Sequence, residues 1–154
     1  MYMDGLLLFD TALALTATAA STNQVDLLNA RDMGVGDDPA LDVVVQVGSA
    51  LLSAGATTLT IQVQGSTDNV TYTTYAQSDA IPKANLTAGA KFSIDMPRMP
   101  PHAAGRPRYL RLNYVVATGP FTGGNITSFI VVDDQQNAGS PNLLGYPPGI
   151  VIAN

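Results

Sequence analysis

The sequence predicts an all-β protein, a jelly-roll-type antiparallel β-sandwich with extended terminal arms. All twelve acidic residues are Asp, Glu is absent and Lys occurs twice, although Glu and Lys are favoured on helix faces and Asp in turns. Several runs alternate apolar and polar side chains with the two-residue period of a strand, and Gly, Pro, Asn and Asp cluster between them. The 154 residues fit one domain, with residues 1–20 and 135–154 expected as extended arms.

The first third of the chain predicts extended structure. Between Leu6 and Thr18, Thr recurs among Ala and Leu, and β-branched Thr favours a strand over a helix. Residues 23–29 are a short strand candidate, and residues 30–39 read as a loop because Gly and Asp-Pro interrupt regular structure. Residues 41–47 are apolar on both faces, which predicts a central strand. A connection is expected over residues 49–56.

The middle of the chain predicts a hairpin. Residues 57–64 alternate most regularly, and they turn through residues 65–69 into a second strand over residues 70–75. A long polar connection over residues 77–90 leads to a strand at residues 91–96. The predicted inward side chains are Leu59, Ile61, Val63, Phe92, Ile94 and Met96. Two packed antiparallel sheets accommodate these strands as a jelly roll or as another sandwich, and propensity does not separate the two topologies.

Residues 108–133 contain two β-rich runs around a turn-forming stretch, which predicts a long hairpin. The runs are residues 108–117 and 126–132, and residues 118–124 supply Gly and Pro for the turn. The first run places Leu110, Leu112, Tyr114 and Val116 on one face and Tyr109, Arg111 and Asn113 on the other. The second run is apolar on both faces, which suggests burial between two layers or covering by a partner.

The low charge of the sequence predicts permanent assembly with partners. Charged residues are 12% of the chain, about half the share of roughly 25% in ordinary domains, and mean hydropathy is +0.17. Interface cores are depleted of charge, whereas an exposed surface normally uses charge to stay apart from its neighbours. A Thr-rich secreted domain is the alternative. The net charge of −5 disfavours nucleic acid as a partner because phosphates would be repelled.

The amino-terminal residues do not fit an export signal. Residues 5–20 have the apolar character and small-residue end of a signal peptide, but no Lys or Arg precedes them, and Asp4 and Asp10 bracket the apolar stretch. No run reaches the length needed to cross a membrane, so no membrane partner is expected. The absence of Cys excludes disulfides and thiolate metal sites.

No pattern in the sequence supports catalysis, and we expect neither an enzyme nor a cofactor. His102 is the single histidine and lies in a proline-rich segment without a nucleophile or an orienting acid. The pairs Asp37-Asp38 and Asp133-Asp134 lack the spacing of a calcium loop, so turn-forming Asp is the better interpretation and no metal is expected.

Two segments are candidates for contacts with a partner. Four of the five Arg fall between residues 98 and 111, where they fit an acidic partner surface, inter-subunit ion pairs or a solubilising loop equally well. The uncharged tail, residues 135–154, is predicted to dock on a neighbour by adding a strand, or else to complete the chain's own sheet. The candidate interface residues are Leu6, Leu8, Phe9, Arg98, Arg106, Arg108, Phe121, Leu143, Leu144, Tyr146, Ile150 and Ile152.

Four segments together resemble the small capsid cement, or decoration, proteins of tailed bacteriophages. They are residues 16–23, 30–36, 58–64 and 108–123, in the same order along the chain, and the last is the most specific. The resemblance implies a jelly-roll structural virion protein on the outer surface of an icosahedral phage head. It would stabilise contacts between major capsid subunits, assemble as a homodimer or homotrimer on a capsid axis, and be made in the host cytoplasm.

The alternative function is a carbohydrate- or receptor-binding jelly roll on a virion surface. Such modules usually place aromatic rings on an exposed face to stack on sugars. The sequence has no Trp, and aromatic residues make up 6% of it, which favours the cement protein.

Overall fold

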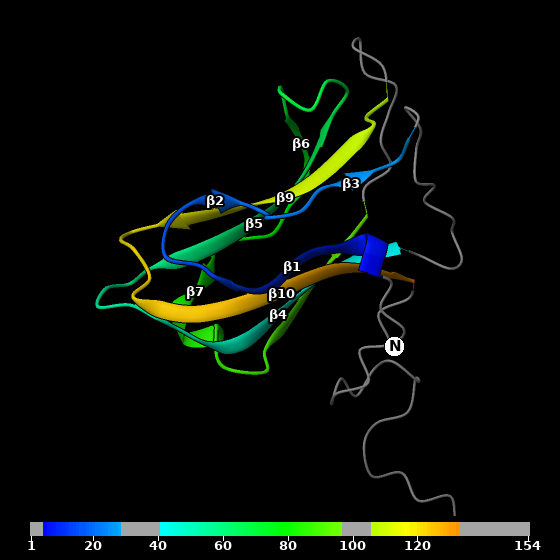
Figure 1. The fold of residues 1–154 in the computed structure, drawn as a ribbon. Helices are drawn as coiled ribbons and strands as arrows, with labels where there is room; N and C mark the ends of the chain where they lie inside the picture. Colours follow the sequence, from blue (N-terminus) through cyan, green and yellow to red (C-terminus); the bar gives the residue numbers. More distant parts are fainter. Residues whose placement is uncertain (1–4, 29–40, 97–105, 133–154) are drawn as a thin grey trace, which may run out of the picture.

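The computed structural model describes residues 5–28, 41–96 and 106–132, which fold into two antiparallel β-sheets packed face to face (Figure 1). The four-stranded sheet runs, in spatial order, β1 (Leu8–Ala14), β10 (Gly123–Val132), β4 (Leu41–Leu52) and β8 (Lys91–Asp95). The six-stranded sheet runs β2 (Ala19–Ala20), β9 (Tyr109–Ala117), β5 (Thr58–Ser66) and β6 (Thr73–Gln77), with β3 (Val25–Asp26) also on β9 and β7 (Ile81–Pro82) also on β5. Two short 3-10 turns are η1 (Gly5–Leu7) and η2 (Lys83–Asn85).

The strand order is that of a jelly roll, because the strand pairs are nested along the chain. Strand β1 pairs with β10, β2 with β9, β4 with β8, and β5 with β6 at the centre of the nest. The chain therefore resembles one long antiparallel hairpin wrapped around a core, with alternate pairs in opposite sheets. This confirms the predicted all-β sandwich, and the β5–β6 pairing confirms the predicted central hairpin.

The hairpin predicted over residues 108–133 is wrong, since β9 and β10 belong to opposite sheets. The chain crosses between the sheets after Thr118 and Gly119, whose φ angles are +64° and +109°. The backbone N–H of Phe121 donates to the Thr16 carbonyl at 2.9 Å, and that of Thr122 donates to the Leu52 carbonyl at 2.7 Å. A two-residue alternation specifies the faces of a strand but not its partner, so the crossing was misread as a turn.

Strand β4 is longer than predicted and continues to Leu52, into the expected connection. The pairing with β10 is irregular around Asn125, whose side-chain oxygen accepts the N–H of Ser49 at 3.1 Å. A Cβ at Gly48 would lie 2.2 Å from that oxygen, so a larger residue there would displace the Asn125 side chain and break its bond to Ser49. Strand β4 lies between β10 and β8, as expected for a central strand.

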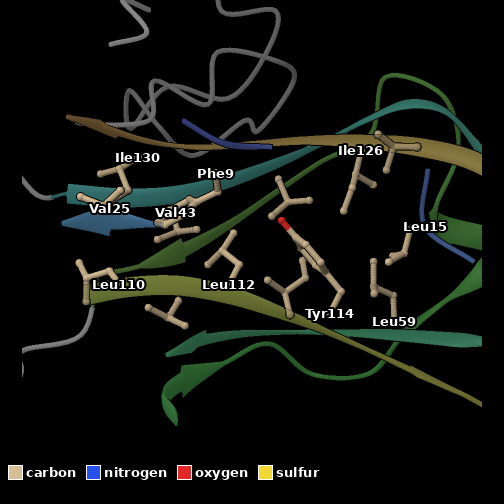
Figure 2. Packing of buried hydrophobic residues seen from close by; sticks show 14 of the residues in the cluster. Phe9, Leu15, Val25, Val43, Leu59, Leu110, Leu112, Tyr114, Ile126 and Ile130 are labelled. Atoms are coloured by element: carbon tan, nitrogen blue, oxygen red, sulfur yellow. The ribbon is translucent and has the colours of Figure 1, made fainter. Parts of the chain in front are cut away.

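The core confirms the predicted faces of β9. Leu110, Leu112 and Tyr114 are fully buried between the sheets (Figure 2). Tyr109, Arg111 and Asn113 are half-buried on the outer face. The prediction of extended structure between Leu6 and Thr18 is confirmed for β1, but it is wrong for Leu6 and Leu7, which belong to the 3-10 turn η1. Residues 8–14 are nevertheless not part of a terminal arm, since β1 pairs with β10.

Two candidate interface residues are wrong because they belong to the core. Phe9 is fully buried and Phe121 is 2% exposed, and both contact the cluster between the sheets. Their large apolar side chains are explained by packing within the chain.

Strand β10 is buried on both faces, as its sequence predicts. Ile126 and Ile130 contact the core between the sheets. On the opposite face, Phe129 and Val131 form a second buried cluster with Val44, against which Leu8 packs.

We predict that Leu112→Asp prevents folding, because it places a carboxylate without a partner in the core. The cost of several kcal/mol is a large part of the typical unfolding free energy of about 5–15 kcal/mol. The matched control is Asn113→Asp on the outer face of the same strand, which should retain a cooperative unfolding transition. Circular dichroism during thermal unfolding measures both. A Leu112→Asp protein with the wild-type melting temperature would contradict the assignment of faces.

Candidate functional site

A buried polar cluster joins the two sheets. The Asp10 carboxylate accepts hydrogen bonds from the Tyr114 hydroxyl at 2.6 Å and from the Ser128 hydroxyl at 3.0 Å. Its other oxygen accepts the Thr22 backbone N–H at 2.7 Å. We call Asp10, Tyr114 and Ser128 the Asp10 cluster; none of the three is more than 1% exposed.

The Tyr114 ring extends from β9 across the core, with its hydroxyl toward the four-stranded sheet (Figure 2). Burial, and then the nearby negative charge of Asp10, raise the pKa of the Tyr114 hydroxyl well above its usual value. The phenol therefore stays a neutral donor. Because the cluster is closed to solvent, it cannot contact a substrate, and its role is to connect the sheets.

The outer face of the six-stranded sheet carries a network of neutral side chains, which we call the amide face. It consists of Gln62, Gln64, Thr74, Gln77 and Asn113. The Asn113 amide donates to Gln62 at 2.8 Å, Gln62 donates to Gln77 at 3.1 Å, and Gln64 donates to Thr74 at 3.2 Å. These bonds hold long side chains in fixed positions, which lowers the entropy lost when a partner covers the face.

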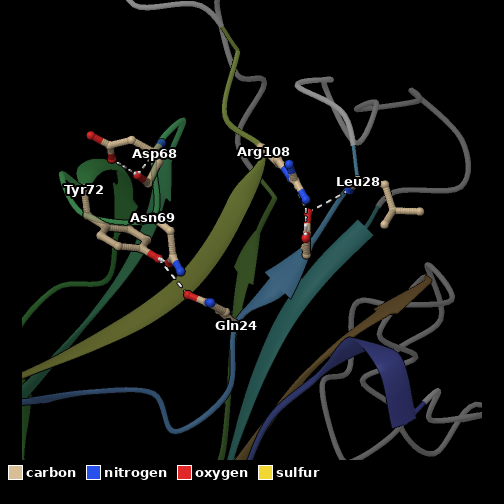
Figure 3. Close-up of polar contacts among 8 residues, drawn as sticks. Gln24, Leu28, Asp68, Asn69, Tyr72 and Arg108 are labelled. Carbon is tan, nitrogen blue, oxygen red and sulfur yellow. Dashed lines mark hydrogen bonds and ion pairs between the residues drawn. The ribbon is translucent and has the colours of Figure 1, made fainter.

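Arg111 lies at the border of the amide face and is held from two sides. Its Nε donates to the Gln64 side-chain oxygen at 3.0 Å, and its guanidinium carbon lies 3.5 Å from the centre of the Tyr72 ring. The Tyr72 hydroxyl in turn donates to the Gln24 side chain at 2.8 Å (Figure 3). Partial burial raises the pKa of Tyr72, so its hydroxyl remains a donor beside the cation.

A groove of about 670 Å³ lies beside Arg111, and we call it the amino-terminal groove. Its lining residues are Gly5, Leu6, Leu8, Ser21, Thr22, Asn23, Gln24 and Arg111. The Asp10 cluster positions one wall through Thr22, and the N–H of Asn23 donates to the Phe9 carbonyl at 2.9 Å. Leu6 is 82% exposed, so the groove combines an aliphatic surface with neutral polar groups and one cation.

The turn between β5 and β6, which directly precedes Tyr72, is held by hydrogen bonds to Asp68. The Asp68 carboxylate accepts the backbone N–H groups of Val70 at 2.9 Å and Thr71 at 2.8 Å, and the Ser66 hydroxyl at 2.8 Å (Figure 3). These donors lower the pKa of Asp68 to about 2. The turn leaves Val70 80% exposed at its tip.

The arginine-rich segment is only partly available to a partner. Arg108 forms a bidentate ion pair with Asp26, with both N–O distances 2.8 Å (Figure 3). Hydrogen bonds from Arg108, and then from the Leu28 N–H, lower the pKa of Asp26. This pair lies within one chain, so the charge of Arg108 is already compensated. Arg106 also has an interaction within the chain, and its side chain is exposed.

The structure thus brings two of the candidate interface residues together, Leu6 and Leu8, in the amino-terminal groove. Six others lie outside the described residues: Arg98, Leu143, Leu144, Tyr146, Ile150 and Ile152. Sequence reasoning included Arg111 only as one member of the arginine-rich segment, and it missed Gln24, Tyr72 and the amide face. The outward Gln, Asn and Thr of the alternating strands were the available signal for that face.

Within residues 5–28, 41–96 and 106–132, no three His, Cys, Asp or Glu side chains gather to hold a metal ion. The same residues contain no helix of the length and apolarity that crossing a membrane requires. His102 and the pairs Asp37-Asp38 and Asp133-Asp134 lie outside the part of the chain that the structure describes.

The fold is a jelly roll, and the described part of its surface carries the amide face and the amino-terminal groove. The chain belongs to the Bbp16 family, whose model matches residues 9–130, from β1 into β10. The name of this family is of a phage type and indicates a virion protein. A search of curated proteins found no match.

We predict that the turn at Asp68 makes stability depend on acid pH. The pKa of Asp68 is about 2 in the folded state, below the ordinary aspartate value of 3.8. Ionised Asp68 therefore stabilises the fold above pH about 4, and this contribution is lost as pH falls toward 2. Denaturant titrations between pH 5 and pH 2 should therefore show a shallower loss of unfolding free energy in Asp68→Asn than in the wild type. Parallel pH profiles for the two proteins would refute this role.

Proposed function

We propose that this protein is a capsid cement, or decoration, protein. It binds the outer surface of an icosahedral phage head and stabilises contacts between major capsid subunits, as a homodimer or homotrimer. The observation that carries the proposal is membership of the phage-type Bbp16 family across most of a jelly-roll fold. The resemblance of residues 108–123 to cement proteins supports it, as does the low charged fraction of 12%.

The amide face and the amino-terminal groove suit such a role physically. Both are preformed in the described residues and almost free of charge, so covering them removes few ionised groups from water. A protein that binds the assembled shell but not separated subunits shifts the equilibrium toward the shell, by about 2.7 kcal/mol per site at a hundredfold excess over Kd. Symmetry then repeats the contact many times, and the repeated contacts add.

The proposed role is structural and not enzymatic. It requires no cofactor, nucleic acid or membrane, and it places the protein on the outer surface of the virion after synthesis in the host cytoplasm. The buried Asp10 cluster supports this assignment because its acid and hydroxyl groups have no access to a substrate.

A carbohydrate- or receptor-binding role has less support. Sugar binding usually depends on an open aromatic face. One face of the Tyr72 ring, which stacks on the groove residue Arg111, is covered by that guanidinium at 3.5 Å.

We predict that phage heads lacking this protein assemble but open at a lower temperature than complete heads, because the shell contacts exist without it and are only reinforced by it. Calorimetry of purified particles measures the opening temperature, and adding the purified protein back should restore it. Equal opening temperatures with and without the protein, or heads that fail to assemble without it, would contradict the proposal.

A further inference from the structure

We infer that the amino-terminal groove docks an extended acidic segment of a major capsid subunit, with a carboxylate on Arg111 and an aliphatic side chain against Leu6. The identity of the partner rests on the proposed function. The chemistry of the groove rests on the residues that line it. Three features carry the inference: the charge at Arg111, the fixed position of its guanidinium, and the composition of the walls.

The charge of Arg111 is not compensated within the described residues. Its contacts are the neutral Gln64 amide and the neutral Tyr72 ring, and among the described residues that line the groove none is acidic. Arg108, on the same stretch of chain, has a bidentate carboxylate partner in Asp26. A carboxylate is the group that matches the remaining donors.

Arg111 is also preorganised to receive that carboxylate. The bond from Nε to Gln64 and the stacking on Tyr72 restrain the plane of the guanidinium, and neither contact uses the two terminal nitrogens. Because the side chain lines the groove, those nitrogens are available to a ligand there. A donor pair that is already oriented loses little entropy on binding.

The walls of the groove fit a peptide. Leu6 and Leu8 provide aliphatic surface. Thr22 and Asn23 line the same groove with neutral polar side chains that can hydrogen-bond to a peptide backbone. A phosphate site would be expected to use several donors or cations, and a sugar site an open aromatic ring. The groove has one cation, and the Tyr72 ring is covered on one side by Arg111.

The test is binding of the full-length protein to purified shells that lack it, measured by co-sedimentation. Arg111→Gln removes the charge, Leu6→Asp places a carboxylate in the groove, and Arg108→Gln is the matched control for loss of an arginine. We expect the first two variants to bind about 10- to 100-fold more weakly, as for loss of a charge-assisted hydrogen bond, and the control to bind within about twofold of the wild type. Melting temperatures establish that each variant is folded.

The outcomes separate this inference from the proposed function. If the wild type binds shells and the two groove variants bind equally well, the docking site is refuted while the cement role stands. If the wild type does not bind shells, the cement role fails.

In that second case the ligand preference of the groove is tested by binding of a capped hexapeptide of alternating Leu and Asp. The Arg111 Nε resonance reports binding, with an Asn-containing peptide, inorganic phosphate and a soluble oligosaccharide as comparison ligands. Binding by the Asp peptide alone, weakened by salt, supports the acidic-peptide groove. Equal binding by the Asn peptide, a preference for phosphate or sugar, or no binding at all would overturn it.

Discussion

The buried carboxylate of Asp10 is the constraint on which the rest of the structure depends. A charged group between two sheets is costly to bury unless its hydrogen-bonding capacity is satisfied. Tyr114 supplies one donor from β9, Ser128 another from β10, and the Thr22 backbone a third. Because these donors come from opposite sheets, the cluster fixes the sheets relative to each other at one point and does not tolerate sliding between them.

The functional surfaces follow from this arrangement. Thr22 lies in the wall of the amino-terminal groove, and Asp10 lies on β1 two positions after Leu8, which also lines the groove. On the far side of β9, alternation turns Arg111 and Asn113 outward while Tyr114 reaches inward. One strand therefore contributes both to the inter-sheet cluster and to the proposed docking surface. A displacement of β9 at the Asp10 cluster would therefore also move the docking surface, because the interior is closely packed.

The local sequence pattern correctly predicted the features of this fold that depend on short-range interactions along the chain. The alternation in β5 and β9 correctly predicted which side chains face the core, since the side-chain period of a strand is a property of the backbone itself. The turn between β5 and β6 was also predicted, and Asp68 explains it through short-range hydrogen bonds. The longer course of β4 was missed because its continuation depends on Asn125, seventy-six positions away from Ser49.

The remaining features depend on partners distant in sequence, and the sequence pattern could not supply them. Thr118 and Gly119 look the same in a hairpin turn and in a crossing between sheets, so β10 was assigned to the wrong neighbour. Asp10 was treated as a charge that interrupts an apolar run, because its donors Tyr114 and Ser128 lie 104 and 118 positions away. The sequence does not distinguish Arg108 from Arg111, since both are arginines of the same charged segment. Only the tertiary structure shows that one has an acidic partner and the other does not among the described residues.

A double-mutant cycle between Asp10 and Tyr114 tests the central claim most directly. Unfolding free energies from denaturant titration would be measured for the wild type, Asp10→Asn, Tyr114→Phe and the double variant. If the Asp10 cluster acts as one unit, each single substitution costs about 1–3 kcal/mol because it leaves a buried group unsatisfied. The double variant should then be more stable than the sum predicts, by about 0.5–3 kcal/mol. Costs that add without coupling would show that the two side chains stabilise the fold independently, and would contradict the account.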